Sequence, residues 1–215
     1  MNIIDCPFID QREKYPTGCE SVSAVMLLRH FGFDVTPEEF IDRCLPKAPV
    51  PVCENGVWYA ADPRHFYLGD PYTDDGWGCF APAVCAGLRT YLPDTADYDV
   101  REVYGQTLSE LCRDYIDRGI PVIVFASMGM AAPKEYRTWT IPETGETYTW
   151  KTPMHCLLLV GYTENMFVFN DPLVGKQTSY PADKASYAHA QMGMQAAVMF
   201  PRPGTDFLFS LKNCK

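Results

Sequence analysis

The most informative stretch of the chain is GCESVSAVMLLRHFG, residues 18–32. It predicts a helix over residues 19–31, because its apolar side chains form one wide face and Gly32 provides the usual C-terminal stop. This helix begins at Cys19, directly after Gly18. Unpaired N–H groups and partial positive charge at a helix N-terminus stabilise a thiolate. We therefore expect Cys19 to have a lowered pKa, as reactive cysteines do.

The composition limits the class of protein. The 215 residues suit one compact domain, and a hydrophobic content of 47% argues against disorder. The net charge of -9, with no basic cluster, argues against a nucleic-acid partner. No apolar run approaches the ~20 residues that cross a bilayer, and residues 1–5 lack the character of a signal peptide. We expect a cytoplasmic protein without a membrane segment, or a secreted one if an N-terminal part has been removed.

The remaining chain predicts helices in its first part and strands in its second. Capping motifs at Thr36 and Thr107 start helices that run to Cys44 and Gly119, and a third helix is expected over residues 79–92. Residues 45–78 are expected to be a loop-like functional insertion. Strands are expected over residues 1–9, 121–125, 155–162, 166–170 and 195–200. This pattern is typical of an α+β fold, in one domain over residues 1–215 with a helical half (1–119) and a mainly antiparallel sheet half (120–215).

The chain holds nine cysteines, a high and odd number. A disulfide scaffold, a metal site or packing in a reducing compartment could each explain it. The absence of CxxC and HxxxH spacings argues against a metal site. We expect all but Cys19 to act mainly as packing residues: Cys6, Cys44, Cys53, Cys79, Cys85, Cys112, Cys156 and Cys214.

One histidine has a plausible catalytic setting. His155 begins an apolar strand, and a hairpin with the next strand brings it near Asn170 or Asp171. A carboxylate there could orient the imidazole by accepting its Nδ1 proton. An Asp-Pro pair also commonly starts a turn, which is the structural alternative for Asp171. Cys19 precedes His155 by 136 residues, within the spacing of about 130–150 found in papain-like enzymes.

Other residues could complete such a site. The backbone N–H of Cys19 and the side-chain N–H of Gln11 are candidate donors to an oxyanion, although Gln11 could equally be a solvated loop residue. Gly18 would let a substrate backbone come close. Trp77 and Trp150 could form a wall of the substrate cleft, and core packing is the alternative for both.

Several motifs together resemble a known family. The segment QREKYPTGCESVSA, residues 11–24, resembles the opening motif of bacteriocin-processing (double-glycine leader) peptidases, the thirty-ninth family of cysteine peptidases, and especially its stand-alone branch. Further similar stretches cover nearly the whole chain: residues 69–71, 77–82, 119–122, 155–162, 170–172 and 192–196. The resemblance implies a papain-like fold and a Cys–His–Asp triad. In it Cys19 is the nucleophile, His155 the base and then acid, Asp171 the orienting group and Gln11 the oxyanion donor.

These observations predict a cysteine peptidase or amidase that acts on a peptide or amide through a thioester acyl-enzyme, without a cofactor or metal. Two alternatives remain open at this point. The same triad could serve an acyl or peptidyl transferase, such as a transamidase or a phytochelatin-synthase-like enzyme. The chain could also be a catalytically silent papain-like binding module. The best-known relatives are fused to export transporters, and no transporter segment is present in this sequence.

Overall fold

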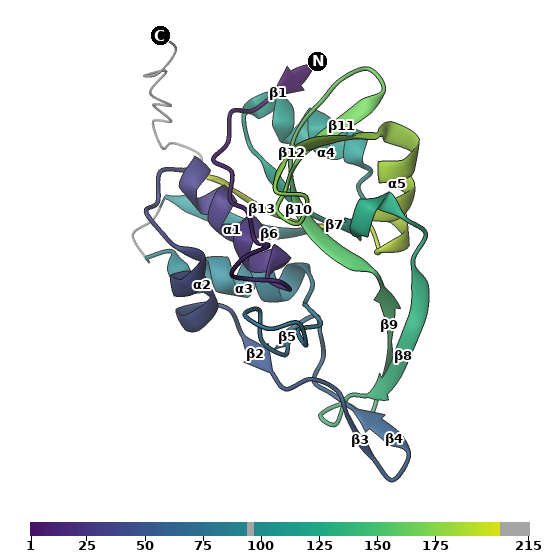
Figure 1. The fold of residues 1–215 in the computed structure, drawn as a ribbon. Coiled ribbons are helices and arrows are strands. Elements are labelled where there is room, and N and C mark those ends of the chain that lie inside the picture. The colour runs from purple at the N-terminus through teal and green to yellow at the C-terminus, as the bar shows by residue number, and fades with distance from the viewer. Residues whose placement is uncertain (94–96, 203–215) are drawn as a thin grey trace.

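A computed structural model describes residues 1–93 and 97–202 (Figure 1). Two groups of helices lie on opposite sides of a central sheet (Figure 1). The first group contains α1 (Cys19–His30), α2 (Pro37–Arg43) and α3 (Ala81–Tyr91); the second contains α4 (Leu108–Asp114) and α5 (Ala182–Gln191). None of the described helices combines the length and the apolar character needed to cross a bilayer.

The central sheet is antiparallel, with strand order β12-β11-β10-β7-β13-β6, and β1 also pairs with β10. It confirms the α+β fold expected from the sequence. The strands are β1 (Asn2–Ile3), β6 (Tyr98–Tyr104), β7 (Val122–Ser127), β10 (Met154–Tyr162), β11 (Met166–Asp171), β12 (Lys176–Pro181) and β13 (Gln195–Pro201).

Some expected boundaries are wrong. The strand expected over residues 1–9 is limited to β1, and residues 4–9 form no regular strand. β6 lies in the first half of the chain but pairs with β13, while α5 lies in the second half. The helices and the sheet are therefore less strictly separated along the sequence than the division at residue 119 suggests.

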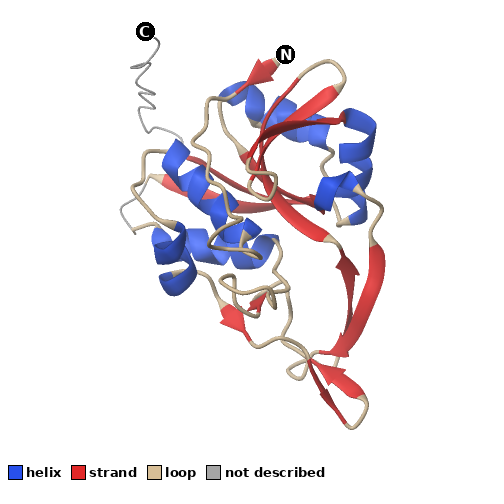
Figure 2. Cartoon of the chain, viewed as in Figure 1, coloured by secondary structure: helices blue, strands red, loops and turns tan. Residues whose placement is uncertain are grey.

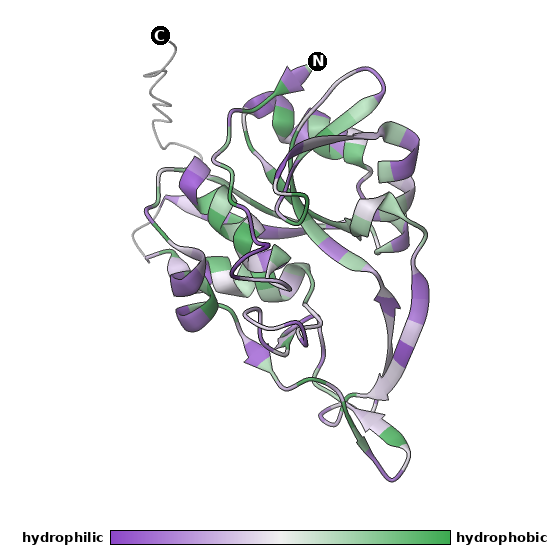
Figure 3. Cartoon of the chain, in the orientation of Figure 1, coloured by the Kyte–Doolittle hydropathy of each residue, from purple (hydrophilic) through white to green (hydrophobic). Residues whose placement is uncertain are grey.

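Helix α1 is the centre of the core, as its apolar face predicts. Residues 19–28 are all buried, because the helix packs between β10 and the neighbouring helices. Apolar residues concentrate along α1 and β10 (Figure 3). Gly18 allows the close turn before the helix, since a Cβ at this position would lie 2.8 Å from Tyr15 Cβ. The start of α1, and with it Cys19, is thus fixed by close packing.

The other helix starts follow their capping signals. The Thr36 side chain accepts a hydrogen bond from the Glu39 N–H at the start of α2. Thr107 and Glu110 form a reciprocal capping box at the start of α4. α4 ends at Asp114, and a 3-10 turn over Ile116–Arg118 continues the chain to Gly119. Both caps were predicted from the sequence.

Residues 45–78 are not the irregular loop that the sequence predicted. They contain β2 (Lys47–Ala48) and β5 (Tyr67–Leu68), which pair in parallel, and β3 (Val52–Glu54) and β4 (Val57–Tyr59). β3 and β4 join β8 (Lys134–Thr140) and β9 (Thr147–Thr152) in a second sheet of order β3-β4-β8-β9. This second sheet, which we call the arm, extends away from the core (Figure 2).

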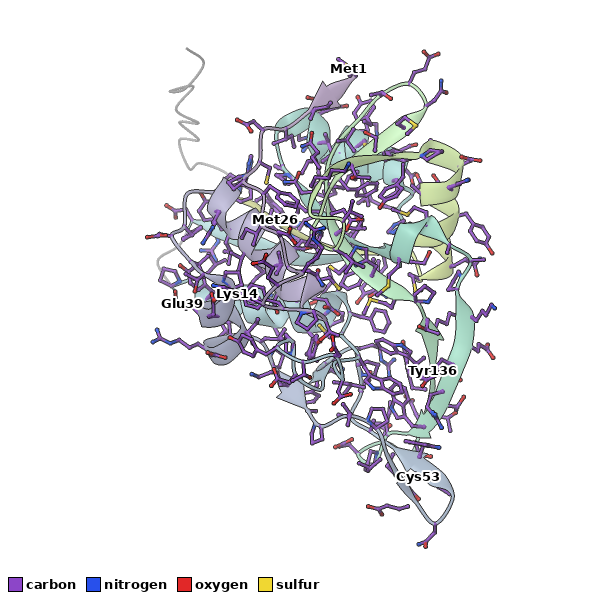
Figure 4. All side chains as sticks on the ribbon, viewed as in Figure 1. Met1, Lys14, Met26, Glu39, Cys53 and Tyr136 are labelled. Atoms are coloured by element: carbon purple, nitrogen blue, oxygen red, sulfur yellow. The ribbon has the colours of Figure 1, made fainter. Side chains whose placement is uncertain are left out.

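All eight cysteines in the described residues are free thiols, and Cys214 lies outside these residues. Most are buried, as expected for packing residues. Cys53 is the exception, because it is exposed in the β3–β4 hairpin at the end of the arm (Figure 4). Cys44 is half-buried.

Candidate active site

Cys19 begins α1 and lies against β10. Its side chain is 6% exposed, and its S–H donates a hydrogen bond to Oε2 of Glu20 over 3.2 Å. Burial is the main cause that raises the pKa of Cys19 well above its usual value, and the Glu20 carboxylate adds to the effect. A hydrogen bond with the Cys156 backbone acts in the opposite direction but does not offset them. The prediction that the helix N-terminus gives the Cys19 thiol a lowered pKa is therefore wrong.

The structure brings His155 and Asp171 together. Nε2–H of His155 donates to Oδ1 of Asp171 over 2.8 Å, and both side chains are only 1% exposed. The antiparallel register pairs Leu158 with Asn170, so Asp171 lies diagonally across the ladder from His155. The contact is made by the distal nitrogen Nε2, whereas the prediction from the sequence was a contact through Nδ1.

Asp171 is held from several sides. Its Oδ1 also accepts the backbone N–H groups of Leu173 and Val174, and its Oδ2 accepts the Tyr180 hydroxyl over 2.7 Å. Burial alone would raise the pKa of Asp171, but the hydrogen bonds and charge of its partners, led by His155, outweigh it and lower the pKa below its usual value. The carboxylate is thus ionised at neutral pH and fixed in orientation.

Nδ1 of His155 is free for another partner. It is buried and has no hydrogen-bond partner among the described residues. Helix α1 packs against β10 on this part of the strand, where the Ser23 hydroxyl donates to the Cys156 carbonyl over 3.4 Å. The imidazole therefore has one nitrogen held by Asp171 and one nitrogen available for proton transfer.

A second buried carboxylate, Glu20, lies in the site and is not among the residues predicted from the sequence. Its Oε1 accepts the Cys79 N–H over 2.8 Å. Burial raises the pKa of Glu20 to about 7, against the hydrogen bonds that favour its ionised form. The position directly after Cys19 was the only signal in the sequence. An acidic residue in the first turn of a helix is ordinarily explained by the helix dipole.

Gln11 lies near the start of α1 and is 1% exposed, so it is not a solvated loop residue. Its Nε2 donates to the Pro16 carbonyl over 3.0 Å, and its Oε1 has no partner among the described residues. The Gln11 backbone N–H donates to the Pro172 carbonyl. The segment that leads to Cys19 is thereby tied to the turn that follows Asp171.

The residues predicted to bind substrate fall into two groups. Gly18 caps α1 beside Cys19, and its N–H donates to the Tyr15 carbonyl. Trp150 is 4% exposed and packs against Trp77 and other aromatic rings. Trp77 is half-buried and also contacts Tyr136. Core packing, the alternative offered for these tryptophans, therefore describes Trp150, while Trp77 retains some exposed surface.

A pocket of about 600 Å³ lies elsewhere, beside strands β3 and β4 of the arm. Apolar side chains such as Val50, Tyr59 and Phe66 line it together with Glu54 and Glu143. None of the predicted catalytic residues lines this pocket. Among the described residues, no group of three or more His, Cys, Asp and Glu side chains could hold a metal ion.

Comparisons with known proteins place the chain in a family. Residues 3–197 match the model of the Peptidase_C39 like family. The uncharacterized protein YvpB of Bacillus subtilis (strain 168) is 26% identical over 183 residues, which cover 85% of this chain and 68% of YvpB. The family resemblance found in the sequence is thus confirmed.

Two solved structures share the fold. A Bacillus anthracis protein assigned as a C39-like peptidase matches with a TM-score of 0.80 and 25% identity, over 94% of this chain and 98% of that one. The peptidase domain of Streptococcus ComA, a bifunctional ABC transporter of a quorum sensing pathway, matches with a TM-score of 0.52 and 12% identity, over 91% and 98%. The family and its structural neighbours support a papain-like cysteine peptidase, and the chain belongs to the Peptidase_C39 like family.

Proposed function

We propose that this protein hydrolyses a peptide or amide bond with Cys19 as the nucleophile, His155 as the general base and acid, and Asp171 as the orienting group. The buried hydrogen bond between His155 Nε2 and Asp171 is the observation that carries the proposal. It fixes the imidazole and leaves Nδ1 to exchange a proton with a thiol at the start of the helix packed against β10.

The reaction has two stages. His155 Nδ1 takes the Cys19 proton as Sγ attacks the carbonyl carbon, which gives a tetrahedral oxyanion. The C–N bond then breaks, the proton on Nδ1 passes to the leaving amine, and a thioester remains on Cys19. In the second stage His155 takes a proton from water as the water attacks the thioester. The C–S bond breaks, the acid product leaves, and Nδ1 returns the proton to Sγ.

The oxyanion needs hydrogen-bond donors that are already in place. The N–H of Cys19 is a suitable donor, because the first N–H groups of a helix have no intrahelical acceptor. Gln11 is the second donor of this proposal. Its amide is buried on the segment that precedes Cys19, and Nε2 has one further hydrogen besides the one donated to Pro16.

A library of fluorogenic peptides tests the proposal. We expect the wild-type protein to release the fluorophore from part of the library, and Cys19→Ala and His155→Ala to lose this release while they stay folded. Cys53→Ala is the matched control, because it removes an exposed thiol on the arm. Release that survives in Cys19→Ala would overturn the proposal, as would a folded wild-type protein that cleaves no member of the library.

A further inference from the structure

The hydrogen of the Cys19 thiol is directed to a carboxylate instead of the catalytic imidazole. Cys19 Sγ donates to Glu20 Oε2 over 3.2 Å, whereas Nδ1 of His155 has no partner among the described residues. A nucleophile ready to react would share its proton with the base. The thiol is therefore held in a resting arrangement.

Glu20 cannot easily turn away from the thiol. Its Oε1 is fixed by the Cys79 N–H, and the side chain is completely buried. Gly78 packs so closely that a Cβ at this position would overlap Oε1 of Glu20 and Cε of Met154. With one carboxylate oxygen fixed in this way, the other is directed at Cys19.

Few groups around Glu20 can carry a positive charge that would offset the charge of its carboxylate. The titratable groups that face it are Cys19 on α1, His155 and Cys156 on β10, Cys79 just before α3, and Tyr67 on β5. Of these, His155 alone can become a cation. A thiolate that forms beside an ionised Glu20 thus meets a like charge in a buried, weakly screened place.

We propose that Glu20 is a positioning residue that keeps the Cys19 thiol protonated in the free protein, so that the thiolate forms only when the S–H turns from Glu20 to His155. The inference rests on the proposed role of Cys19 as nucleophile.

The effect of Glu20 on the thiol depends on pH, because it follows from the ionisation of the Glu20 carboxyl group. Because burial raises the pKa of Glu20 to about 7, the carboxylate accepts the thiol hydrogen above that pH. Below it, a protonated Glu20 no longer repels a thiolate.

Glu20→Gln tests this inference without removing the packing. The amide oxygen can still accept the Cys79 N–H, while the amide N–H₂ donates to Sγ and favours the thiolate. Native protein is treated with iodoacetamide over a range of pH, and the modification of each cysteine is followed by peptide mass spectrometry. We expect the alkylation of Cys19 near neutral pH to be at least about tenfold faster in Glu20→Gln, equivalent to one pKa unit.

Cys53 is the internal control, because its exposed thiol lies on the arm and should react equally in both proteins. A Cys19 rate that is unchanged or slower in folded Glu20→Gln would overturn the inference. A change in packing alone would raise the alkylation rate of Cys19 without moving the pH at which that rate is half-maximal. This result would also count against the inference.

A measurement on the wild-type protein covers the case in which Glu20→Gln does not fold. The ultraviolet absorbance of a thiolate is obtained as the difference between the wild type and Cys19→Ala. We expect no thiolate band near neutral pH, and a clear band there would contradict the role of Glu20. Neither experiment needs a substrate, so a failure of the inference and a failure to hydrolyse peptides can be told apart.

Discussion

The Tyr180 hydroxyl donates a 2.7 Å hydrogen bond to Oδ2 of Asp171, the carboxylate whose other oxygen holds His155. Tyr180 lies on β12 and reaches the site because β12 pairs with β11 in the antiparallel sheet. Tyrosine and histidine thus fix the two oxygens of one carboxylate. The orientation of the imidazole depends on both contacts.

We expect Tyr180→Phe to weaken this arrangement without abolishing it. Loss of a hydrogen bond to a charged group costs about 1.5–3 kcal/mol, so kcat/KM should fall by roughly tenfold or more. Steady-state kinetics on a peptide cleaved by the wild type provides the measurement. Tyr187→Phe is the control, since Tyr187 is exposed on α5. Equal kinetics for the two variants would show that Tyr180 does not support Asp171.

Asp171→Asn should affect both activity and the dependence of stability on pH. We expect kcat to fall by roughly a hundredfold or more, because the imidazole loses the charge that stabilises its protonated form. The pKa of Asp171 is lower in the folded protein than its usual value. Its ionised form therefore stabilises the fold above the usual pKa of about 4, and this contribution is lost as the pH falls through the lowered folded value.

Urea unfolding of the wild type and Asp171→Asn at several pH values measures this contribution. The difference in the free energy of unfolding should be largest near neutral pH and should shrink in acid. Asp183→Asn, at an exposed position in the first turn of α5, controls for the loss of one carboxylate. A difference that grows as the pH falls would contradict the lowered pKa of Asp171.

Gly78→Ala should destabilise the protein through two separate effects. Gly78 has a φ of +115°, and a Cβ there would overlap Glu20 and Met154. We expect a loss of roughly 1–3 kcal/mol in the free energy of unfolding. Gly105→Ala separates the effects, because Gly105 has a φ of +75° but nothing within 4 Å of its Cβ position. If both variants lose equal stability, the close packing around Glu20 has no measurable cost.

Trp150→Ala should act on stability. Trp150 is buried against Trp77, Phe80 and Trp139. Truncation of such a side chain costs about 3–5 kcal/mol, which urea unfolding can detect. Tyr136→Ala, which removes an exposed ring beside Trp77, should change stability by less than about 0.5 kcal/mol. A stable Trp150→Ala with a changed KM would restore the substrate-cleft role suggested by the sequence.

The parts of the fold with strong local signals were predictable from the sequence. Helix α1 combines a wide apolar face with Gly32 at its end, and Thr107 and Glu110 form a capping box. The parts that were missed have weak local signals. β12 is an exposed, polar edge strand, and α5 buries little more than two alanines and His189. The arm depends on pairing between β4 and β8, which are far apart in the chain.

The candidate site also has features that the local sequence predicts and features that it does not. The proximity of His155 and Asp171 follows from a short hairpin, so local spacing was sufficient to predict it. The burial of Glu20 depends on Cys79, 59 residues away in the sequence, and no local pattern reveals it. For this reason the pKa of Cys19 was expected to be lowered, while the structure raises it. Burial and one neighbouring carboxylate are the main causes of the raised pKa.

The role of Cys19 as nucleophile is tested most directly by trapping its acyl-enzyme. Wild-type protein is mixed with a cleavable peptide, quenched in acid within one turnover and mapped by mass spectrometry. We predict that the acyl part of the peptide is found on Cys19 and is released by neutral hydroxylamine, as expected for a thioester. An acyl group on any other residue, or continued cleavage by Cys19→Ala, would contradict the account.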